Sequence, residues 1–421
     1  MIVTFLDIVL ISTYFLLLFL SIFWLLVLFS NEEKEEKKVK KIESYPLFSV
    51  IVPAYNEEES IERTLASVTG LEYPPGRLEI IVVNDGSTDN TKAIVEQFIK
   101  NNPHRNITLI SQKNQGKGKA MNVGLAGIKG EFFACLDADS FVSPNALKIM
   151  LPLFADEEVG AVCPLLKVKK PDSVLQKVQW CEYIINMFYR YLNAKLNCIH
   201  VTPGPFSVYR AEVIRKLGGY DEKTITEDLE IAIRLQKHNY KILHTFDTTV
   251  ETVSPTTWKA LFRQRVRWYK GAVDNTINYK KLIFNKKYGD FGIIRMPTIV
   301  ASGAVSIILT AALMHSFGKK MLQTFISLKD VNFDIITLIK GYTFSFNFLN
   351  LPLFKIVIAS TLFAISFFVM IYSFKIVREK ITNYGRTWLS LVTYIFIYSL
   401  FLTTVWVYIA YMLVKKKKNF W

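Results

Sequence analysis

The feature that most restricts how this chain can fold is a run of apolar residues near its start. Residues 8–29 contain no charged side chain, and roughly 20 such residues are what a helix needs to cross a bilayer. No basic stretch precedes the run and no small-residue cleavage site follows it, so the run predicts an anchor and not a signal peptide. Residues 296–317, 356–374 and 388–414 form three further candidates.

Between the first run and the later ones lies a polar block of soluble-domain size, at about residues 45–275. We therefore expect three parts. Residues 1–42 form a transmembrane helix and a charged linker, and residues 43–275 form a folded domain with amphipathic interface helices. Residues 276–421 form an interface segment and about three transmembrane helices.

The orientation follows from the charges. Lys and Arg favour the cytoplasmic side of a membrane, so the large basic block is expected in the cytosol. With three later helices, the basic tail at residues 415–418 would end on the opposite side. The alternative is that part of residues 321–354 also crosses or re-enters the membrane.

The composition argues against a cysteine or histidine metal site, a disulfide framework and a nucleic-acid partner. The four cysteines are scattered without a Cys-x-x-Cys pair, and the five histidines have no metal-ligand spacing, so reduced core thiols are expected. The net charge is +15, but no aromatic-basic motif for nucleic acid accompanies it. The basic excess indicates contact with a membrane surface and an anionic substrate, and no nucleic acid.

The polar block alternates buried-strand runs with helical periods. The expected strands are residues 47–52, 78–83, 107–111 and 131–134, and the expected helices among them are residues 58–71, a segment ending at 99, and residues 120–128. Strand and helix in alternation predict an α/β domain, Rossmann-like, with a mostly parallel sheet covered by helices. Pro53 is expected to break the first strand.

Polar groups follow three of these strands: Asn56 with Glu57, Asp85, and Asp137 with Asp139. Ligands of such sheets bind outside the carboxyl ends of the strands. Two carboxylates that stand two residues apart in a turn can converge on one hard cation, which in turn could hold a diphosphate. The alternative for this pair is a solvated turn.

Other segments allow two interpretations. The basic loop at 114–119 suits a phosphate at a helix start or is only solvated. The helix at 173–196 lies in a membrane interface or packs on its own domain. Acids at the start of the helix after residue 225 complement the helix dipole, and the same field would keep Asp228 ionised, as a general base requires.

Together these motifs resemble glycosyltransferase family 2. The motifs are Ser49-Val-Ile-Val-Pro-Ala-Tyr-Asn-Glu57, Val83-Asn-Asp-Gly-Ser-Thr-Asp89, Asn114-Gln-Gly-Lys117, Asp137-Ala-Asp139, Thr226-Glu-Asp228 and Gln264-Arg-Val-Arg-Trp268. The last two look like the membrane-integrated, processive branch, which includes cellulose, hyaluronan, chitin and poly-N-acetylglucosamine synthases. The resemblance covers roughly residues 47–275 and implies an A-type glycosyltransferase domain in the cytosol, joined to transmembrane helices.

The resemblance also implies site residues. They are Pro53, Tyr55, Glu57, Asp85, Lys117, Asp137, Asp139, Gln264, Arg267 and Trp268 for the donor; Asp137 and Asp139 for Mg²⁺ or Mn²⁺; Glu227 and Asp228 for catalysis; and Phe206 and Trp268 for the acceptor. Asp85 would accept from the uracil ring, Lys117 would lie by the diphosphate and Asp228 would be the base.

We therefore hypothesise an inverting transfer of sugar from UDP-GlcNAc or UDP-Glc to a growing β-linked polysaccharide, coupled to membrane translocation. One alternative is transfer of a single sugar to a polyprenyl phosphate or other lipid acceptor. A second is a non-catalytic membrane scaffold or a component of an export channel. The run from Gly204 to Arg210 looks more like hyaluronan-type synthases, whereas Thr226-Glu-Asp228 looks more like cellulose or poly-N-acetylglucosamine ones, which leaves the sugar open.

Overall fold

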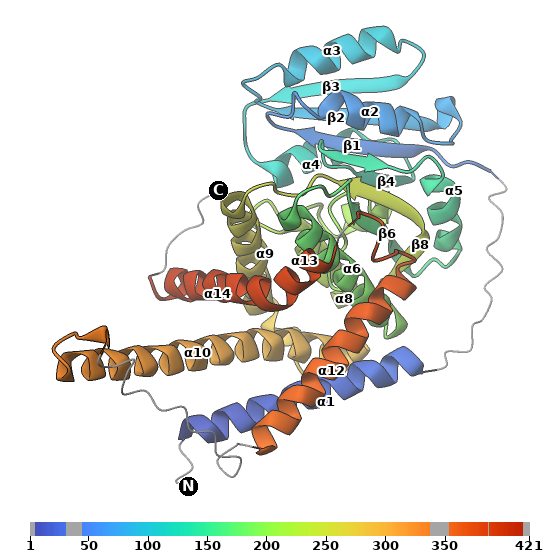
Figure 1. Cartoon of the computed structure of the whole chain (residues 1–421). Coiled ribbons are helices and arrows are strands. Elements are labelled where there is room, and N and C mark those ends of the chain that lie inside the picture. Colours follow the sequence, from blue (N-terminus) through green and yellow to red (C-terminus); the bar gives the residue numbers. More distant parts are fainter. Residues whose placement is uncertain (1–4, 31–43, 337–352, 386, 416–421) are drawn as a thin grey trace. The chain divides into compact units, whose positions relative to one another are not determined.

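Figure 1 shows the computed structural model, which describes residues 5–30, 44–336, 353–385 and 387–415. The charged linker, the basic tail beyond Lys415, and residues 337–352 of the stretch that could re-enter the membrane lie outside these residues. The chain divides into two compact units. The unit with the sheet comprises Asn31–Ile299 and Ser373–Phe401; the other comprises Met1–Ser30, Val300–Tyr372 and Leu402–Trp421.

Eight strands of the described chain form one sheet in the order β3-β2-β1-β4-β7-β6-β8-β5. They are β1 (Phe48–Ala54), β2 (Leu78–Asp85), β3 (Asn106–Gln112), β4 (Phe132–Cys135), β5 (Ser140–Val142), β6 (Val159–Val168), β7 (Val208–Arg210) and β8 (Lys241–Thr252). β3, β2, β1 and β4 are parallel neighbours, as are β6 and β8, whereas β7 and β5 pair antiparallel. The predicted mostly parallel sheet is confirmed.

Helices cover both faces of this sheet (Figure 1). They are α2 (Ile61–Thr69), α3 (Thr91–Asn101), α4 (Lys117–Gly127), α5 (Ala146–Met150), α6 (Val174–Lys195), α7 (Ala211–Lys216), α8 (Glu227–Lys237) and α9 (Trp258–Asn278). The helices expected between the first strands, the helix after residue 225 and the helix at 173–196 are all present.

Alternate residues of the central strand β1 point into two different cores. Phe48, Val50 and Val52 pack with residues of α2, α3 and α5, while Ile51 packs with residues of α4, α7 and α8. All seven residues of β1 are buried. Successive side chains of a strand point to opposite faces, so a continuous apolar run predicts a strand that is covered on both sides. This is why β1 could be recognised from the sequence.

The end of β1 differs from the prediction. The strand continues through Pro53 to Ala54, and these two residues pair with Val83 and Asn84 of β2. Pairing with β4 stops at Ile51, so no strand faces the missing amide proton of Pro53 on that side. A proline is tolerated in a strand where no ladder partner requires its N–H. The interpretation of Pro53 as a strand breaker was therefore wrong.

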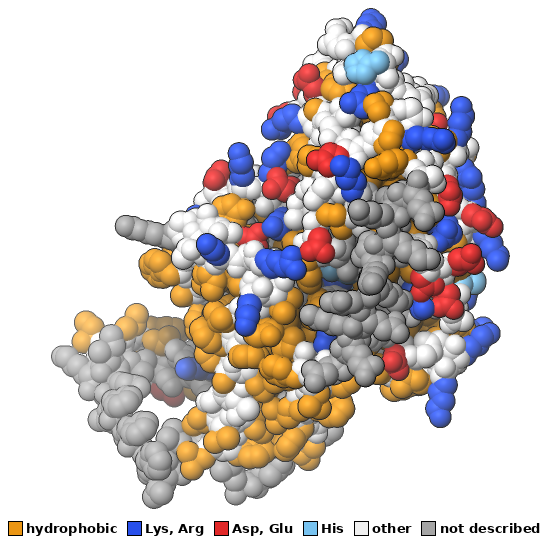
Figure 2. Space-filling model, turned by 90° about the vertical axis from the view of Figure 1, so that its right-hand side faces the viewer, with side chains coloured by type: hydrophobic (Ala, Val, Ile, Leu, Met, Phe, Trp, Pro, Cys, Tyr) orange, Lys and Arg blue, Asp and Glu red, His pale blue; other side chains and the backbone are white. Residues whose placement is uncertain are grey.

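Among the described residues, four helices are long and apolar enough to cross a membrane: Asp7–Phe29, Phe291–Asp330, Leu353–Ile376 and Trp388–Val414. They correspond to the four predicted apolar runs, and they contain α1 (Phe5–Phe29), α10 (Met296–Asp330), α12 (Leu353–Ile376), α13 (Trp388–Val392), η7 (Thr393–Tyr398) and α14 (Ser399–Val414). Their surfaces are rich in exposed hydrophobic side chains, whereas charged side chains are scattered over the rest of the view in Figure 2.

Within the second unit, α1 packs against α12. Asp7 and Lys355 form an ion pair of 2.8 Å, and the ring of Phe29 lies 6.4 Å from the rings of both Phe368 and Tyr372. Aromatic pairs at such distances add to the packing of apolar helices.

The segment Ser373–Phe401 belongs to the same compact unit as the sheet. Trp180 of α6 packs edge-on against Phe374 and Tyr384, and Lys167 of β6 forms an ion pair of 2.7 Å with Glu379. The sheet unit thus extends beyond residue 275, where the sequence placed the end of the folded domain, and it takes in a later part of the chain.

Candidate active site

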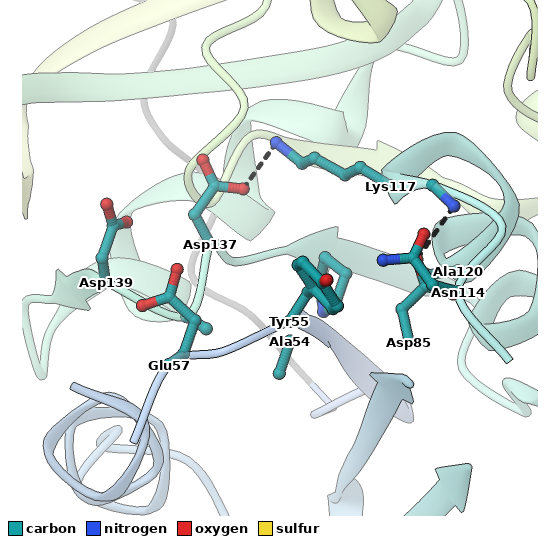
Figure 3. A pocket seen from close by; sticks show the side chains of 12 residues that line it. Ala54, Tyr55, Glu57, Asp85, Asn114, Lys117, Ala120, Asp137 and Asp139 are labelled. Atoms are coloured by element: carbon teal, nitrogen blue, oxygen red, sulfur yellow. Dashed lines mark hydrogen bonds and ion pairs between the residues drawn. The ribbon is translucent and has the colours of Figure 1, made fainter. Parts of the chain in front are cut away.

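A cavity of about 290 Å³ lies at the carboxyl ends of β1, β2 and β4 (Figure 3). Its lining consists of Pro53, Ala54, Tyr55, Glu57, Asp85, Asn114, Gly116, Lys117, Ala120, Asp137, Ala138 and Asp139. Seven of these are residues that the resemblance assigned to the donor, so the structure brings the first four motifs together at one place. The cavity is near the lower end of the range for ligand pockets, roughly 300–1,000 Å³.

The loop after β1 is fixed to the loop after β2 by Asn56. Its backbone has a φ of 55°, a left-handed conformation that asparagine tolerates better than most residues. The side-chain oxygen of Asn56 accepts from the Thr88 backbone N–H at 2.8 Å, and the Asn56 backbone N–H donates to Ser87 Oγ at 3.1 Å. These bonds fix the positions of its neighbours, Tyr55 and Glu57, at the rim of the cavity.

Asp85 holds the start of helix α4. Its carboxylate accepts from the backbone N–H groups of Gln115 at 3.0 Å and Gly116 at 2.9 Å, and from the Gln112 side chain at 2.7 Å. Gly116 has a φ of 91°, which a residue with a Cβ rarely adopts. The buried Asp85 therefore organises the loop that places Lys117, in addition to the nucleotide contact expected of it.

Lys117 joins two motifs that lie far apart in the sequence. Its Nζ lies 2.7 Å from Asp137 Oδ1 and 2.7 Å from Glu227 Oε1. Burial disfavours the charge on Lys117, but the two carboxylates outweigh it and raise the pKa of Lys117. Burial likewise opposes the charge on Glu227, yet Lys117 holds the pKa of Glu227 below its ordinary value. The donor motifs and the Glu227–Asp228 motif therefore share one site.

Asp228 follows Glu227 in the first turn of α8. Burial, and then the charge of Glu227, raise the pKa of Asp228 to about 6, against the opposing influence of Lys117 and Arg267. One carboxylate oxygen of Asp228 accepts from the Leu229 backbone N–H at 2.9 Å. A carboxyl group with such a pKa can accept a proton near neutral pH, which is the property of a general base.

The carboxylates of Glu57, Asp137 and Asp139 lie on one side of the cavity (Figure 3). Burial, and then the charges of Asp137 and Glu57, raise the pKa of Asp139 to about 6. Burial also raises the pKa of Glu57, to which Asp137 contributes. Carboxylates whose pKa values are raised by burial and by a neighbouring negative charge are stabilised in their ionised forms by a nearby cation.

This donor set fits a hard divalent cation that takes further ligands from outside the protein. Carboxylate oxygens are the ligands that Mg²⁺ and Mn²⁺ prefer, and Asp137 Oδ1 is buried with no hydrogen-bond partner apart from the ion pair with Lys117. The described residues contain no group of three or more Asp, Glu, His or Cys side chains that could hold a metal ion by itself. Mg²⁺ is commonly held by one or two carboxylates together with phosphates and water.

Helix α9 carries Gln264, Arg267 and Trp268. Arg267 lies close enough to Glu227 and Asp228 to lower the pKa of both, so the structure brings it to the site. Trp268 and Gln264 are half-buried and lie next to Arg265, a residue that the sequence analysis did not single out. The Trp268 ring lies 6.4 Å from that of Tyr183 on α6.

The loop before β7 differs from expectation. Phe206 is fully buried in the core beside Phe48, with a φ of 58°, and its backbone N–H donates to the Cys135 carbonyl. Its side chain is therefore not exposed to an acceptor in this conformation. Gly204 of the same loop lies against the site instead, because a Cβ there would be 3.4 Å from both Asp137 Oδ2 and Lys117 Nζ. The Pro-Gly-Pro sequence was the only signal of this close approach.

The chain is similar in sequence to known glycosyltransferases. The model of "Glycosyl transferase family 2" matches residues 49–218. The chain is 32% identical over 282 residues to a poly-beta-1,6-N-acetyl-D-glucosamine synthase of Staphylococcus epidermidis, covering 63% of this chain and 67% of that protein. It is also 32% identical to the probable glycosyltransferase YdaM of Bacillus subtilis, covering 60% and 64%. The alignments span about two thirds of these relatives.

Among solved structures, the fold is similar to that of the mannosyltransferase PcManGT from Pyrobaculum calidifontis in complex with GDP-Man and Mn²⁺. The TM-score is 0.57 at 21% identity, covering 80% of this chain and 99% of the other. At this identity the similarity establishes the fold alone. It confirms the predicted class, a Rossmann-like A-type glycosyltransferase domain.

Proposed function

Because this chain belongs to glycosyl transferase family 2 and is a glycosyltransferase, we propose that it transfers a sugar from a UDP-sugar to a growing β-linked polysaccharide. UDP-GlcNAc and UDP-Glc are the proposed donors. The observation that carries the proposal is the contact of Lys117 with both Asp137 and Glu227. This contact joins the nucleotide-side motifs and the catalytic motif in one site.

The donor would bind in the cavity at the ends of β1, β2 and β4. Pro53, Tyr55 and Asp85 line the part proposed for the nucleotide, and Lys117 at the first position of α4 is proposed for the diphosphate. A lysine and free backbone N–H groups at a helix start suit such an anion. Asp137 and Asp139 would hold Mg²⁺ or Mn²⁺, which neutralises developing charge on a diphosphate when bound.

Transfer would proceed by one displacement at the anomeric carbon. Asp228 takes the proton from the acceptor hydroxyl as that oxygen bonds to the anomeric carbon, and the bond between this carbon and the UDP oxygen breaks. Lys117 and Arg267 lie near the acidic groups and would stabilise the negative charge on the departing UDP. A single displacement inverts the anomeric centre, so an α-linked donor gives a β-linked product.

The relatives support an N-acetylglucosamine polymer as the product, since the first of them is named as a poly-beta-1,6-N-acetyl-D-glucosamine synthase. The four apolar helices support an enzyme integral to the cell membrane, with the sheet unit on the cytosolic side. Processive addition and translocation of the product belong to the same proposal. The donor-side carboxylates line one cavity, and Lys117 links them to Glu227, which is followed by Asp228; this arrangement favours an enzyme over a scaffold or a channel component.

The test is a donor panel with the full chain purified in detergent. We expect release of UDP from UDP-GlcNAc or UDP-Glc only when a divalent cation is present, and a radiolabelled product that grows to many sugars. A product that carries one sugar and extracts with lipid would replace the polymer proposal with transfer to a polyprenyl phosphate. No release of UDP from any donor would refute the proposed use of a UDP-sugar.

A further inference from the structure

Arg265 stands inside the Gln264–Trp268 motif but was given no role by the sequence. The side chain of Arg265 is completely buried. Arg263, two residues earlier on the same helix, is exposed. A guanidinium group is costly to bury unless its charge and its five donors are satisfied. The contacts of Arg265 therefore indicate what it holds in place.

Two of these contacts tie α9 to other elements. The guanidinium forms a bidentate ion pair with Glu182 of α6, through Nη2 to one oxygen and through Nε to the other at 3.1 Å. Nε also donates to the hydroxyl of Tyr398 in η7 at 3.0 Å. Bidentate pairs fix the orientation of the planar group as well as its position.

The two other contacts are with neighbours on α9. The centre of the guanidinium lies 4.0 Å from the centroid of the Trp268 ring, a cation–π contact. Nη1 donates to the side-chain oxygen of Gln264. Since arginine can only donate, the Gln264 amide must present its oxygen to Arg265. Within the part of the chain described, the Gln264 amide nitrogen has no hydrogen-bond partner, so it is available to donate elsewhere.

We propose that Arg265 is a positioning residue, which fixes the ring plane of Trp268 and the amide orientation of Gln264 for the transfer reaction. Anchored by Glu182 and Tyr398, the guanidinium turns the Gln264 amide so that it offers N–H groups to the oxygen-rich sugar of the donor or the acceptor. This inference rests on the proposed function, because the readout is sugar transfer. It extends that function by naming a residue that touches neither substrate.

The hydrogen bond between Arg265 and Tyr398 links α9 to a later part of the chain. Tyr398 belongs to the π-helical stretch η7 of the last apolar helix, and residues 373–401 are part of the sheet unit. Phe401 packs against Trp258 and Phe262 at the start of α9. The orientation of Trp268 and Gln264 therefore depends on a segment more than 100 residues further along the chain.

The experiment compares four variants of the full chain in detergent. Arg265→Lys keeps the charge but loses the bidentate geometry, and Arg263→Lys is its matched control on the exposed side of α9. Tyr398→Phe removes one hydrogen bond and leaves the ion pair. The double variant Arg265→Met with Glu182→Gln removes both charges, so that neither is left buried alone. Sugar transfer gives kcat and KM, UDP binding gives Kd, and thermal unfolding gives Tm.

We expect Arg265→Lys and the double variant to lower kcat at least tenfold, while the Kd for UDP stays within about threefold because the cavity is untouched. Tyr398→Phe should lower kcat by a smaller factor, and Arg263→Lys should match the wild type. The double variant should unfold at a Tm near that of the wild type. A double variant with a Tm near that of the wild type and a lowered kcat would show that Arg265 positions the site and does not only stabilise the fold.

The inference would be overturned by a double variant whose kcat and Tm both equal those of the wild type. It would also be overturned by an Arg265→Lys variant with an unchanged kcat. If the double variant does not fold, the comparison of Arg265→Lys and Tyr398→Phe with Arg263→Lys decides alone. A wild-type chain that transfers no sugar would overturn the proposed function, and this inference with it. If the wild type is active and the Arg265 variants have the same kcat as the wild type, the inference is overturned and the proposed function stands.

Discussion

At the scale of single residues, Lys117 balances the charges of the cavity. It contacts Asp137 and Glu227 at 2.7 Å each, in a region that also contains Glu57, Asp139 and Asp228. Burial, together with the charges of neighbouring carboxylates, raises the pKa values of Glu57, Asp139 and Asp228, the acidic groups that do not pair with Lys117. The chemistry proposed for the site follows from which of these groups ionise and when.

The first prediction concerns Asp228. Replacement by Asn keeps the size of the side chain but removes the base, so kcat should fall by about 100- to 10,000-fold. Binding of UDP should persist, because Asp228 does not line the donor cavity. UDP release and calorimetric UDP binding measure the two effects. The exposed Asp172 provides the control, and Asp172→Asn should keep full activity. Undiminished transfer by Asp228→Asn would refute the assignment of the base.

The second prediction is the pH dependence. Asp228 must be ionised to accept a proton, and its pKa in the protein without substrate is about 6, so kcat/KM should fall about tenfold per pH unit well below pH 6. Stability should show the opposite trend. Since the folded pKa lies above the ordinary value, the stability that the protonated form contributes is complete below about pH 4 and is lost as the pH rises through about 6.

Replacing Asp228 with Asn removes this charge. The variant should therefore unfold at a higher temperature than the wild type above pH 6, and the difference should shrink toward pH 4. Thermal unfolding of both proteins across this pH range measures it, and kcat/KM of the wild type is followed in parallel. An equal Tm at every pH would show that burial of the Asp228 charge does not cost the fold stability.

The third prediction concerns metal removal. If Asp137 and Asp139 hold a divalent cation together with the diphosphate, a chelator should abolish UDP release, and Mn²⁺ or Mg²⁺ should restore it. Asp139→Asn should raise the metal concentration needed for half-maximal activity, because one charged ligand is lost. UDP release over a metal titration measures both. Full activity after exhaustive chelation would contradict a metal role at this site.

At the scale of elements, the packing of α4 on β1 places Lys117. A Cβ at Gly124 of α4 would lie 2.4 Å from Ile51 Cγ2 in the central strand, whereas a Cβ at Gly127 would meet its nearest neighbour, Ile81 Cδ1, at 3.4 Å. The first distance is a clash with a stiff β-branched side chain, and the second is an ordinary contact. The two glycines thus form a matched pair on one helix.

The fourth prediction follows from this pair. Gly124→Ala should destabilise the protein by about 1–3 kcal/mol through overpacking and should raise the KM for the donor, because α4 carries Lys117. Gly127→Ala should leave both nearly unchanged. Thermal unfolding and donor titrations compare the variants. Equal behaviour of the two would mean that Ile51 relaxes without moving α4.

Also at this scale, the strands show which elements a sequence can predict. β1, β2 and β3 and the start of β4 are unbroken β-favouring runs and were expected. β6 was not, because Gly160 and Pro164 interrupt its apolar pattern. The structure accommodates both residues at register shifts against β8, and irregular pairing of this kind depends on the partner strand. β5 and β7 have three residues each, too few for a pattern.

At the scale of the whole molecule, the sheet unit includes a late part of the chain. Trp180 is only 1% exposed, and it packs on Phe374 and Tyr384. Lys167 and Arg265 also find partners in this segment, Glu379 and Tyr398. The late segment therefore completes the surface of the unit that holds the cavity.

The fifth prediction is that a chain ending at Tyr372 will not keep a stable sheet unit. Loss of residues 373–401 would expose Trp180 and remove the hydroxyl partner of Arg265, so protease cleavage in α6 and α9 should become much faster. Limited proteolysis of full and shortened chains in the same detergent measures this. Equal resistance of both would show that the late segment covers the unit without supporting it.

The sequence by itself determined the kinds of elements and the edge of the sheet at which chemistry occurs. Apolar runs give buried strands and long apolar helices, and the polar residues that follow parallel strands must meet at one edge. Asn56, Glu57, Asp85, Asp137 and Asp139 could be placed in this way. The tertiary structure alone decided that Lys117 meets Glu227, that Arg265 pairs with Glu182, that Phe206 turns into the core and that residues 373–401 join the catalytic unit. These contacts join residues whose own neighbours in sequence carry no information about the partner, so only the packing of the folded chain selects them.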